Sequence, residues 1–156
     1  MIIRKARKED VSNILDLWRE LSEYHRNFND YMNITSDWRK KLEKVFNKDI
    51  ESDSSIIYVA EKDGRCIGFI RSEIRNTNNI FVSNKSAFIT DIYIEKKYRG
   101  IGVAEELVDK VSNWCNEKKV YNLRLNVNSE NERAIGLYLK KGFKEVNRTL
   151  KKNINV

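Results

Sequence analysis

The sequence predicts one α/β domain of the α+β type, spanning residues 1–156, with a central mixed, mostly antiparallel, twisted sheet and about four flanking helices. Apolar residues recur at helical spacing in several stretches, and shorter apolar runs with strand alternation lie between them. Turn residues separate the runs. The predicted order of elements is β-α-α-β-β-β-α-β-α-β. A chain of 156 residues can bury a substantial core without disulfides.

The N-terminal part is predicted to form a strand and two helices. Residues 1–6 form the strand, and Asp10 caps a helix with the apolar stripe Val11, Ile14, Leu15, Trp18 and Leu21. Glu20 is expected to lie on the solvated face of that helix. A second helix carries Trp38, Leu42, Val45 and Phe46 on one face. Residues 23–35, between the helices, are polar but rich in aromatics, and form either a surface loop or the wall of a substrate pocket.

The middle of the chain is predicted to form three antiparallel strands. The run SSIIYVAE is followed by the turn KDGR and the run CIGFIRSEIR, and Asp63-Gly64 is a strong hairpin signal. The asparagine-rich residues 76–79 mark the next connection. A third strand then runs from about Ala87 to Ile94.

The stretch from Phe88 to Leu107 is typical of a phosphate-binding turn, because an apolar strand leads through two glycines into an amphipathic helix. Gly100 and Gly102 permit a tight turn that directs successive amides toward a ligand. The helix entry at about Gly102 favours an anion, and Arg99 adds a positive charge. The third glycine of a dinucleotide-binding turn is missing, as is the Gly-Lys-Ser/Thr of a Walker A loop.

The C-terminal part is predicted to form a helix, a strand, a helix and a last strand. The strand YNLRLNVN follows a crossover helix, so it is expected to lie parallel to the strand that ends at Ile94. Asn131 caps the final helix and Gly142 ends it. The last segment, from Phe143, is predicted to be one strand with a ragged or turned-back end.

Composition limits the functional classes. No apolar run approaches the roughly 18 residues of a membrane-spanning helix, and the N-terminus lacks a signal-peptide apolar region, so a cytoplasmic location without a membrane partner is expected. The basic residues behind the net charge of +7 are interspersed with acidic ones. The charge alone does not distinguish a nucleic-acid partner from a phosphate-bearing cofactor. Cys66 and Cys115 are expected to be reduced core thiols. His25 is the only histidine, so no metal site is expected.

Two segments carry a family resemblance. Arg99-x-x-Gly102-x-Ala104 resembles the acyl-CoA signature of the GNAT acetyltransferase superfamily, Gln/Arg-x-x-Gly-x-Gly/Ala. Asn131-x-x-Ala134-x-x-Leu137-Tyr138, followed by Gly142-Phe143, is similar to a second segment of that superfamily. The predicted element order is that of the GNAT fold, so the resemblance covers nearly the whole chain.

The resemblance implies acetyl-CoA as co-substrate and no metal. It implies that the pantetheine arm pairs with main-chain groups of Ile92, Tyr93 and Ile94, in a gap between splayed strands. It places the CoA phosphates at Arg99, Gly100, Ile101, Gly102, Val103 and Ala104, and it brings Asn131 and Tyr138 to the CoA arm.

Acetyl transfer to an amine needs a proton for the departing thiolate and a group that neutralises the ammonium. The resemblance implies Tyr138 as general acid, and a phenol with a pKa near 10 can donate to a thiolate. Asp91 and Glu73 are candidate bases. Asp91 is expected to share a strand face with Ile89 and Tyr93, opposite Thr90. Tyr24, His25 and Asp30 are candidates for the acceptor pocket.

The leading hypothesis is an N-acetyltransferase that transfers acetyl from acetyl-CoA to a primary amine, of a small molecule, peptide or protein, within a ternary complex. No cysteine is placed for a covalent intermediate. Two alternatives stay open: a basic nucleic-acid-binding module, which the charge pattern does not favour, and a GNAT-fold protein that binds CoA without catalysis. Dimerisation is common in that family, so a homodimer is also an open alternative. The sequence does not identify the acceptor.

Overall fold

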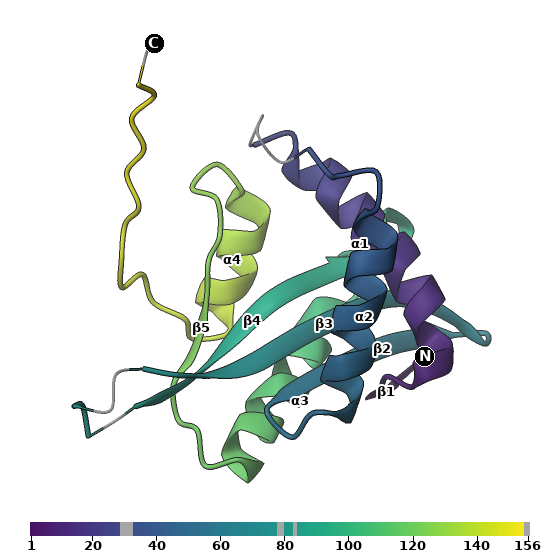
Figure 1. Ribbon diagram of the computed structural model, residues 1–156, viewed down its shortest axis with the longest axis horizontal. Coiled ribbons are helices and arrows are strands. Elements are labelled where there is room, and N and C mark those ends of the chain that lie inside the picture. The colour runs from purple at the N-terminus through teal and green to yellow at the C-terminus, as the bar shows by residue number, and fades with distance from the viewer. Residues whose placement is uncertain (29–32, 78–79, 83, 155–156) are drawn as a thin grey trace.

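The computed structural model describes residues 1–28, 33–77, 80–82 and 84–154. Figure 1 shows their arrangement, with the sheet at the centre and helices on both of its faces. The elements in chain order are β1 (Ile2–Lys5), η1 (Lys8–Asp10), α1 (Val11–His25), α2 (Trp38–Glu51), β2 (Ser55–Lys62), β3 (Arg65–Asn76), β4 (Lys85–Ile94), η2 (Lys96–Tyr98), α3 (Val103–Glu117), β5 (Leu123–Leu125) and α4 (Glu132–Lys140).

The sheet has the strand order β1-β2-β3-β4-β5. The first four strands pair antiparallel with their neighbours, while β5 pairs parallel to β4. The predicted mixed, mostly antiparallel sheet is therefore confirmed, as is the parallel placement of the strand after the crossover helix. At the hairpin between β2 and β3, Asp63 and Gly64 have φ angles of 52° and 74°, as a two-residue turn with left-handed positions requires.

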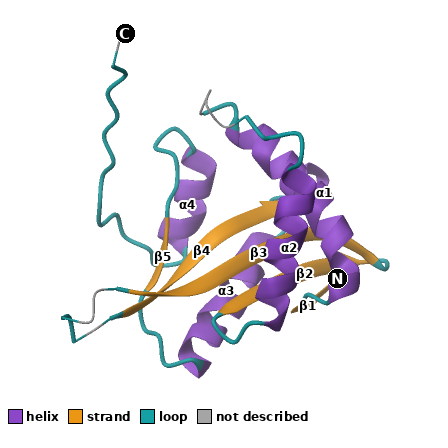
Figure 2. Cartoon of the chain, in the orientation of Figure 1, coloured by secondary structure: helices purple, strands orange, loops and turns teal. Residues whose placement is uncertain are grey.

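Each face of the sheet buries its own apolar cluster. Figure 2 shows α1 and α2 on one face and α3 on the other. Val108, Val111 and Trp114 of α3 pack on Ile70, Ile89 and Ile94. On the opposite face, Ile14 and Leu15 of α1 and Phe46 of α2 pack on Val59 and Phe69. Because helices cover both faces of the sheet, the first six residues of β2 are all buried.

A β-bulge at Thr90 changes which side chains of β4 share a face. Arg71 of β3 pairs with Asp91, and the next residue, Ser72, pairs with Ile89, so Thr90 is the extra residue. Ile89 consequently packs with α3, whereas Tyr93 packs with α1 and α2. The prediction that Asp91 shares a face with Ile89 was wrong, because the bulge breaks the alternation between them. Asp91 does share its face with Tyr93, since Trp18 of α1 bonds to it.

Two further predictions need correction. The last segment forms no strand over residues 144–154, and Figure 1 shows it running away from the body as an extended trace. Asp10 does not cap α1 through its side chain. Its carboxylate instead accepts the Arg7 amide at 2.7 Å and both terminal nitrogens of Arg4 at 2.7 and 2.9 Å, so it anchors β1 to the turn before the helix.

Within the described residues, none of the helices combines the length and the apolar character that a bilayer crossing requires.

Candidate active site

The site begins where β4 and β5 separate. The two strands pair only from Ala87 to Ile89 of β4, opposite Leu123 to Leu125 of β5. Beyond Ile89 no pairing with β5 is present among the described residues, so the rest of β4 forms one wall of an open gap. The pairing thus ends before the residues beside which the resemblance places the splay of neighbouring strands.

Hydrogen-bond alternation identifies the main-chain groups that face this gap. The amide of Glu95 donates to the carbonyl of Ile67 on β3 at 2.9 Å. Because adjacent residues of a strand direct their amides to opposite sides, the main chain of Ile94 and Ile92 faces the gap. Tyr93, between them, directs its amide and carbonyl to β3. Of the three residues expected to hold pantetheine by their main chain, only Ile92 and Ile94 are so oriented.

A glycine turn closes the end of the gap. Gly100 and Gly102 have φ angles of 82° and 90°, which favour glycine, and α3 starts directly after them at Val103. The first intrahelical bond runs from Glu106 to the Gly102 carbonyl at 3.0 Å, which leaves the amides of Val103, Ala104 and Glu105 without intrahelical acceptors. Ile101 is exposed at the turn, and Val103 directs its side chain into the core. The turn therefore offers amides to an anion, as predicted.

The side chain of Arg99 does not extend toward this turn. Its Nε donates to the carbonyl of Ile94 at 2.7 Å, and its guanidinium lies 5.1 Å from the ring centre of Tyr93 and 5.5 Å from that of Tyr24. The positive charge expected beside the phosphates thus lies at the end of β4, between two aromatic rings. It orders the strand end and joins it to α1.

Helix α4 carries Asn131 and Tyr138 seven residues apart, so both lie on one side of the helix. The Asn131 side chain accepts the amide of Ala134 at 3.3 Å, which confirms the predicted cap. Gly142 has a φ of 85° and ends the helix, as predicted. Burial raises the pKa of Tyr138 to about 12, so its phenol keeps its proton at neutral pH.

Two of the three acceptor-pocket candidates lie at the end of α1. The Tyr24 hydroxyl donates to Oδ1 of Asn131 at 3.4 Å, which links α1 to α4. His25 is half-buried, and desolvation lowers its pKa, although the charge of Asp91 acts in the opposite direction. The third candidate, Asp30, lies outside the described residues. The structure therefore brings Tyr24 beside the cap of α4.

The two candidate bases share one cation. Nη1 of Arg71 lies 3.2 Å from Asp91, and Nη2 lies 3.4 Å from Glu73, while Nε bonds to Asp49 at 2.5 Å. Asp91 also accepts the indole N–H of Trp18 at 3.0 Å. Glu73 pairs in register with Phe88, at the end of β4 that is still joined to β5, so it lies away from the gap. Arg71 therefore contacts both candidate bases and Asp49, and Glu73 also pairs with Arg75 at 2.6 Å.

Glu20, which the sequence predicts to be solvated, is exposed and also contacts β4. Glu20 of α1 accepts the hydroxyl of Tyr93 at 2.8 Å. The available signal was its spacing, because Glu20 precedes Tyr24 by one helical turn and so lies on the same side of α1. A surface Glu on an amphipathic helix has the same spacing, and only the tertiary contact distinguishes the two cases.

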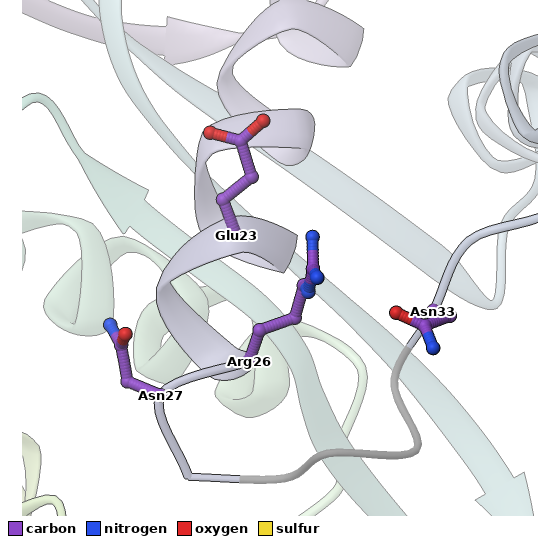
Figure 3. Close-up of a pocket in the computed structure, with 4 residues that line it drawn as sticks. All are labelled: Glu23, Arg26, Asn27 and Asn33. Atoms are coloured by element: carbon purple, nitrogen blue, oxygen red, sulfur yellow. The ribbon is translucent and has the colours of Figure 1, made fainter.

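A polar hollow of about 420 Å³ lies at the same end of α1. Glu23, Arg26, Asn27 and Asn33 line it, as Figure 3 shows. Tyr24 and His25 lie between Glu23 and Arg26 in the chain, so the hollow borders the C-terminal end of α1.

Comparisons with known proteins agree with this geometry. The model of the acetyltransferase (GNAT) family matches residues 14–143. An uncharacterized N-acetyltransferase of Methanocaldococcus jannaschii is 27% identical over 143 residues, which span 92% of this chain and 60% of that protein. The thialysine N-epsilon-acetyltransferase of Bos taurus is 26% identical over 155 residues, 94% of this chain and 85% of that protein.

Among solved structures, a predicted acetyltransferase of Clostridium acetobutylicum with acetyl-CoA has a TM-score of 0.79 at 21% identity. The similarity covers 97% of this chain and 95% of that one. At this identity the match shows the shared fold. Since the family model spans most of the sequence, the chain belongs to the acetyltransferase (GNAT) family and is an acyl-CoA-dependent acetyltransferase.

Proposed function

We propose that this protein transfers the acetyl group of acetyl-CoA to a primary amine by direct attack in a ternary complex. The observation that carries the proposal is the gap between β4 and β5, which continues into the glycine turn at the start of α3. Main-chain groups of Ile92 and Ile94 can pair with the pantetheine arm, and the amides of residues 103–105 can receive the pyrophosphate.

Chemistry at the thioester needs a polarised carbonyl and a protonated leaving group. The Ile94 amide faces the gap, where it can donate to the thioester oxygen as negative charge develops there. Tyr138, on the side of α4 that also carries Asn131, then gives its proton to the departing thiolate sulfur. The raised pKa of Tyr138 suits an acid, because the phenol remains protonated through the pH range of the reaction.

The acceptor class rests on family and surface chemistry. The name of the bovine relative specifies an ε-amine, which is a primary amine on a side chain. The net charge of +7 disfavours polycationic acceptors and allows neutral or acidic amines, peptide N-termini and protein lysines. Asp91 is the better placed of the two candidate bases, because it shares the face of Tyr93, and it forms an ion pair with Arg71 at 3.2 Å.

A calorimetric titration with acetyl-CoA tests the cofactor site, and thiol release in the presence of a panel of amines tests transfer. One-to-one binding that survives added salt is expected. Ala104→Asp should weaken binding through crowding and repulsion at the phosphates. Asn113→Asp adds the same charge on an exposed part of α3 and should leave binding unchanged. Equal affinities for both variants would contradict the proposed cofactor site.

A further inference from the structure

The hydrogen bond between Glu20 and Tyr93 joins α1 to the strand that borders the cofactor gap. The donor is the phenol of Tyr93, a residue that is 8% exposed, and the acceptor is Oε2 of Glu20, at 2.8 Å. Glu20 itself is exposed, so solvent and ligands can reach its carboxylate. The pair therefore connects a buried hydroxyl to an accessible acid.

Its position is fixed relative to the gap. Tyr93 lies between Ile92 and Ile94, whose main chain faces the cofactor. Arg99 contacts the Tyr93 ring and donates to the Ile94 carbonyl, so one side chain ties the ring to the strand end. The same guanidinium lies over Tyr24, which bonds to the α4 cap. The Tyr93 hydroxyl is thus held on the face of β4 that α1 covers.

Glu20 differs from the other acidic candidates in its partners. Asp91 and Glu73 each form an ion pair with Arg71, at 3.2 and 3.4 Å. Among the described residues, no Lys, Arg or His nitrogen lies within 4.0 Å of the Glu20 carboxylate. The adjacent Arg19 pairs with Glu23 instead, with 3.4 Å between Nε and Oε1.

From these contacts we infer that Glu20, through the hydroxyl of Tyr93, accepts the proton of the acceptor ammonium. This inference rests on the proposed function, because it supplies the base that acetyl transfer to an amine requires. As an N–H proton of the ammonium passes to the Tyr93 oxygen, the phenolic proton passes to Oε2 of Glu20, and Tyr93 is left neutral. Glu20 then releases the proton to solvent.

The remaining bonds balance around this step. The freed nitrogen lone pair forms the N–C bond at the thioester carbon, and the C–S bond breaks. The thiolate takes a proton from Tyr138, and the second N–H proton, lost as the amide forms, replaces it. Desolvation and the bond to Glu20 raise the pKa of Tyr93 to about 12, so its phenol acts as a neutral relay and not as a phenolate.

The test compares Glu20→Gln with Glu23→Gln, an exposed glutamate on the same helix that pairs with Arg19. Gln at position 20 can still accept the Tyr93 hydrogen bond but cannot take up a proton. The probes are a peptide with a free alanine α-amine and an α-blocked lysine with a free ε-amine. Their pKa values, near 8 and 10.4, make the fraction of neutral amine at pH 7 differ about 250-fold.

Glu20→Gln should lower kcat/KM for the ε-amine by about 100-fold at pH 7, and by less for the α-amine, more of which is already neutral. The loss should shrink as the pH rises toward the amine pKa. The charged and titratable groups around Glu20 are Tyr93, Arg99, Tyr24, Arg19 and Glu23. Acetyl-CoA affinity should stay unchanged, and Glu23→Gln should match the wild type on both amines.

Activity of Glu20→Gln equal to that of Glu23→Gln would overturn the inference. So would a loss that is the same for both amines at every pH, or weaker binding of acetyl-CoA, because either indicates a structural effect. Tyr93→Phe should act like Glu20→Gln, and the double variant should lose no more than either single one. If the wild type binds acetyl-CoA but acetylates no amine, the proposed function fails and this inference with it; a wild type that is active beside an equally active Glu20→Gln removes Glu20 alone.

Discussion

The carbonyl oxygen of Tyr138 accepts the amide of Phe143 at 3.0 Å, and the two rings meet edge to face with their centres 5.6 Å apart. Both contacts depend on the left-handed Gly142, which turns the chain back at the end of α4. The helix stop therefore fixes the main chain and the ring of the residue to which we assign the role of acid. The turn from Tyr138 to Phe143 therefore positions the Tyr138 side chain.

Replacing Tyr138 with Phe keeps the ring packing and removes only the hydroxyl. We expect kcat to fall about 100-fold, because the thiolate would leave without a proton donor, while acetyl-CoA affinity stays within about twofold. Thiol-release kinetics and calorimetry measure the two quantities. Tyr121→Phe, at an 83% exposed tyrosine, is the matched control. Unchanged turnover in Tyr138→Phe would remove the hydroxyl from the mechanism.

Gly102→Ala should lose about 1–2 kcal/mol of unfolding free energy and also weaken acetyl-CoA binding. The φ of 90° strains any residue with a Cβ, although an added Cβ would meet no atom within 4 Å. Gly64→Ala, at a φ of 74° in the β2–β3 hairpin, should lose similar stability and keep its affinity for acetyl-CoA. Urea denaturation and calorimetry separate the two effects. Full affinity in Gly102→Ala would show that the turn does not need its observed conformation to bind CoA.

Arg71→Met should destabilise the protein by about 3–5 kcal/mol, because it leaves the buried Asp49 and the largely buried Asp91 without their cation. Arg75→Met, at a half-exposed arginine that pairs with Glu73 and lies over the Phe88 ring, should lose no more than about 1 kcal/mol. Chemical denaturation of both variants checks the difference. Similar losses would mean that the Arg71 cluster is not the energetic centre of this face.

His25 should make the protein less stable as the pH falls through the range below its unfolded pKa, about 6.5. Desolvation lowers its pKa in the folded state, so between the folded and unfolded pKa values the unfolded chain binds more protons, and stability rises with pH. His25→Gln should flatten this part of the stability profile. Thermal unfolding from pH 5 to pH 7 measures the slope for both proteins, and an identical slope would contradict the assigned environment.

Periodicity and turn chemistry predict most of this fold. Asp63, Gly64 and Gly142 have left-handed dihedral angles, and they lie at the hairpin and at the helix end that the sequence predicts. Asn131 was identified as a cap for the same reason, because local hydrogen bonding determines its role. Such features depend on a few adjacent residues, which a single sequence displays in full.

The sequence does not display the contacts between distant segments that complete this region. The solvated spacing of Glu20 carries no trace of Tyr93, 73 residues away. The last segment forms no strand over residues 144–154, and its apolar residues Val146, Leu150 and Ile154 stand four apart, without the period of two that a half-buried strand shows. The charge of Arg99 suggested a phosphate contact, whereas the Ile94 carbonyl and two aromatic rings hold it at the strand end.

The extra residue in β4 also determines how this strand can change over evolutionary time. Upstream of Thr90 the odd-numbered Ile89 packs with α3, and downstream the even-numbered Ile94 does so. Removing Thr90 would restore a regular register and keep every face as it is, because Ile89 and Asp91 already pair with the adjacent residues Ser72 and Arg71. A single-codon deletion at Thr90 would thus leave Asp91 and Tyr93 on the face covered by α1 and α2, so the strand can lose this residue without rearranging that row of side chains.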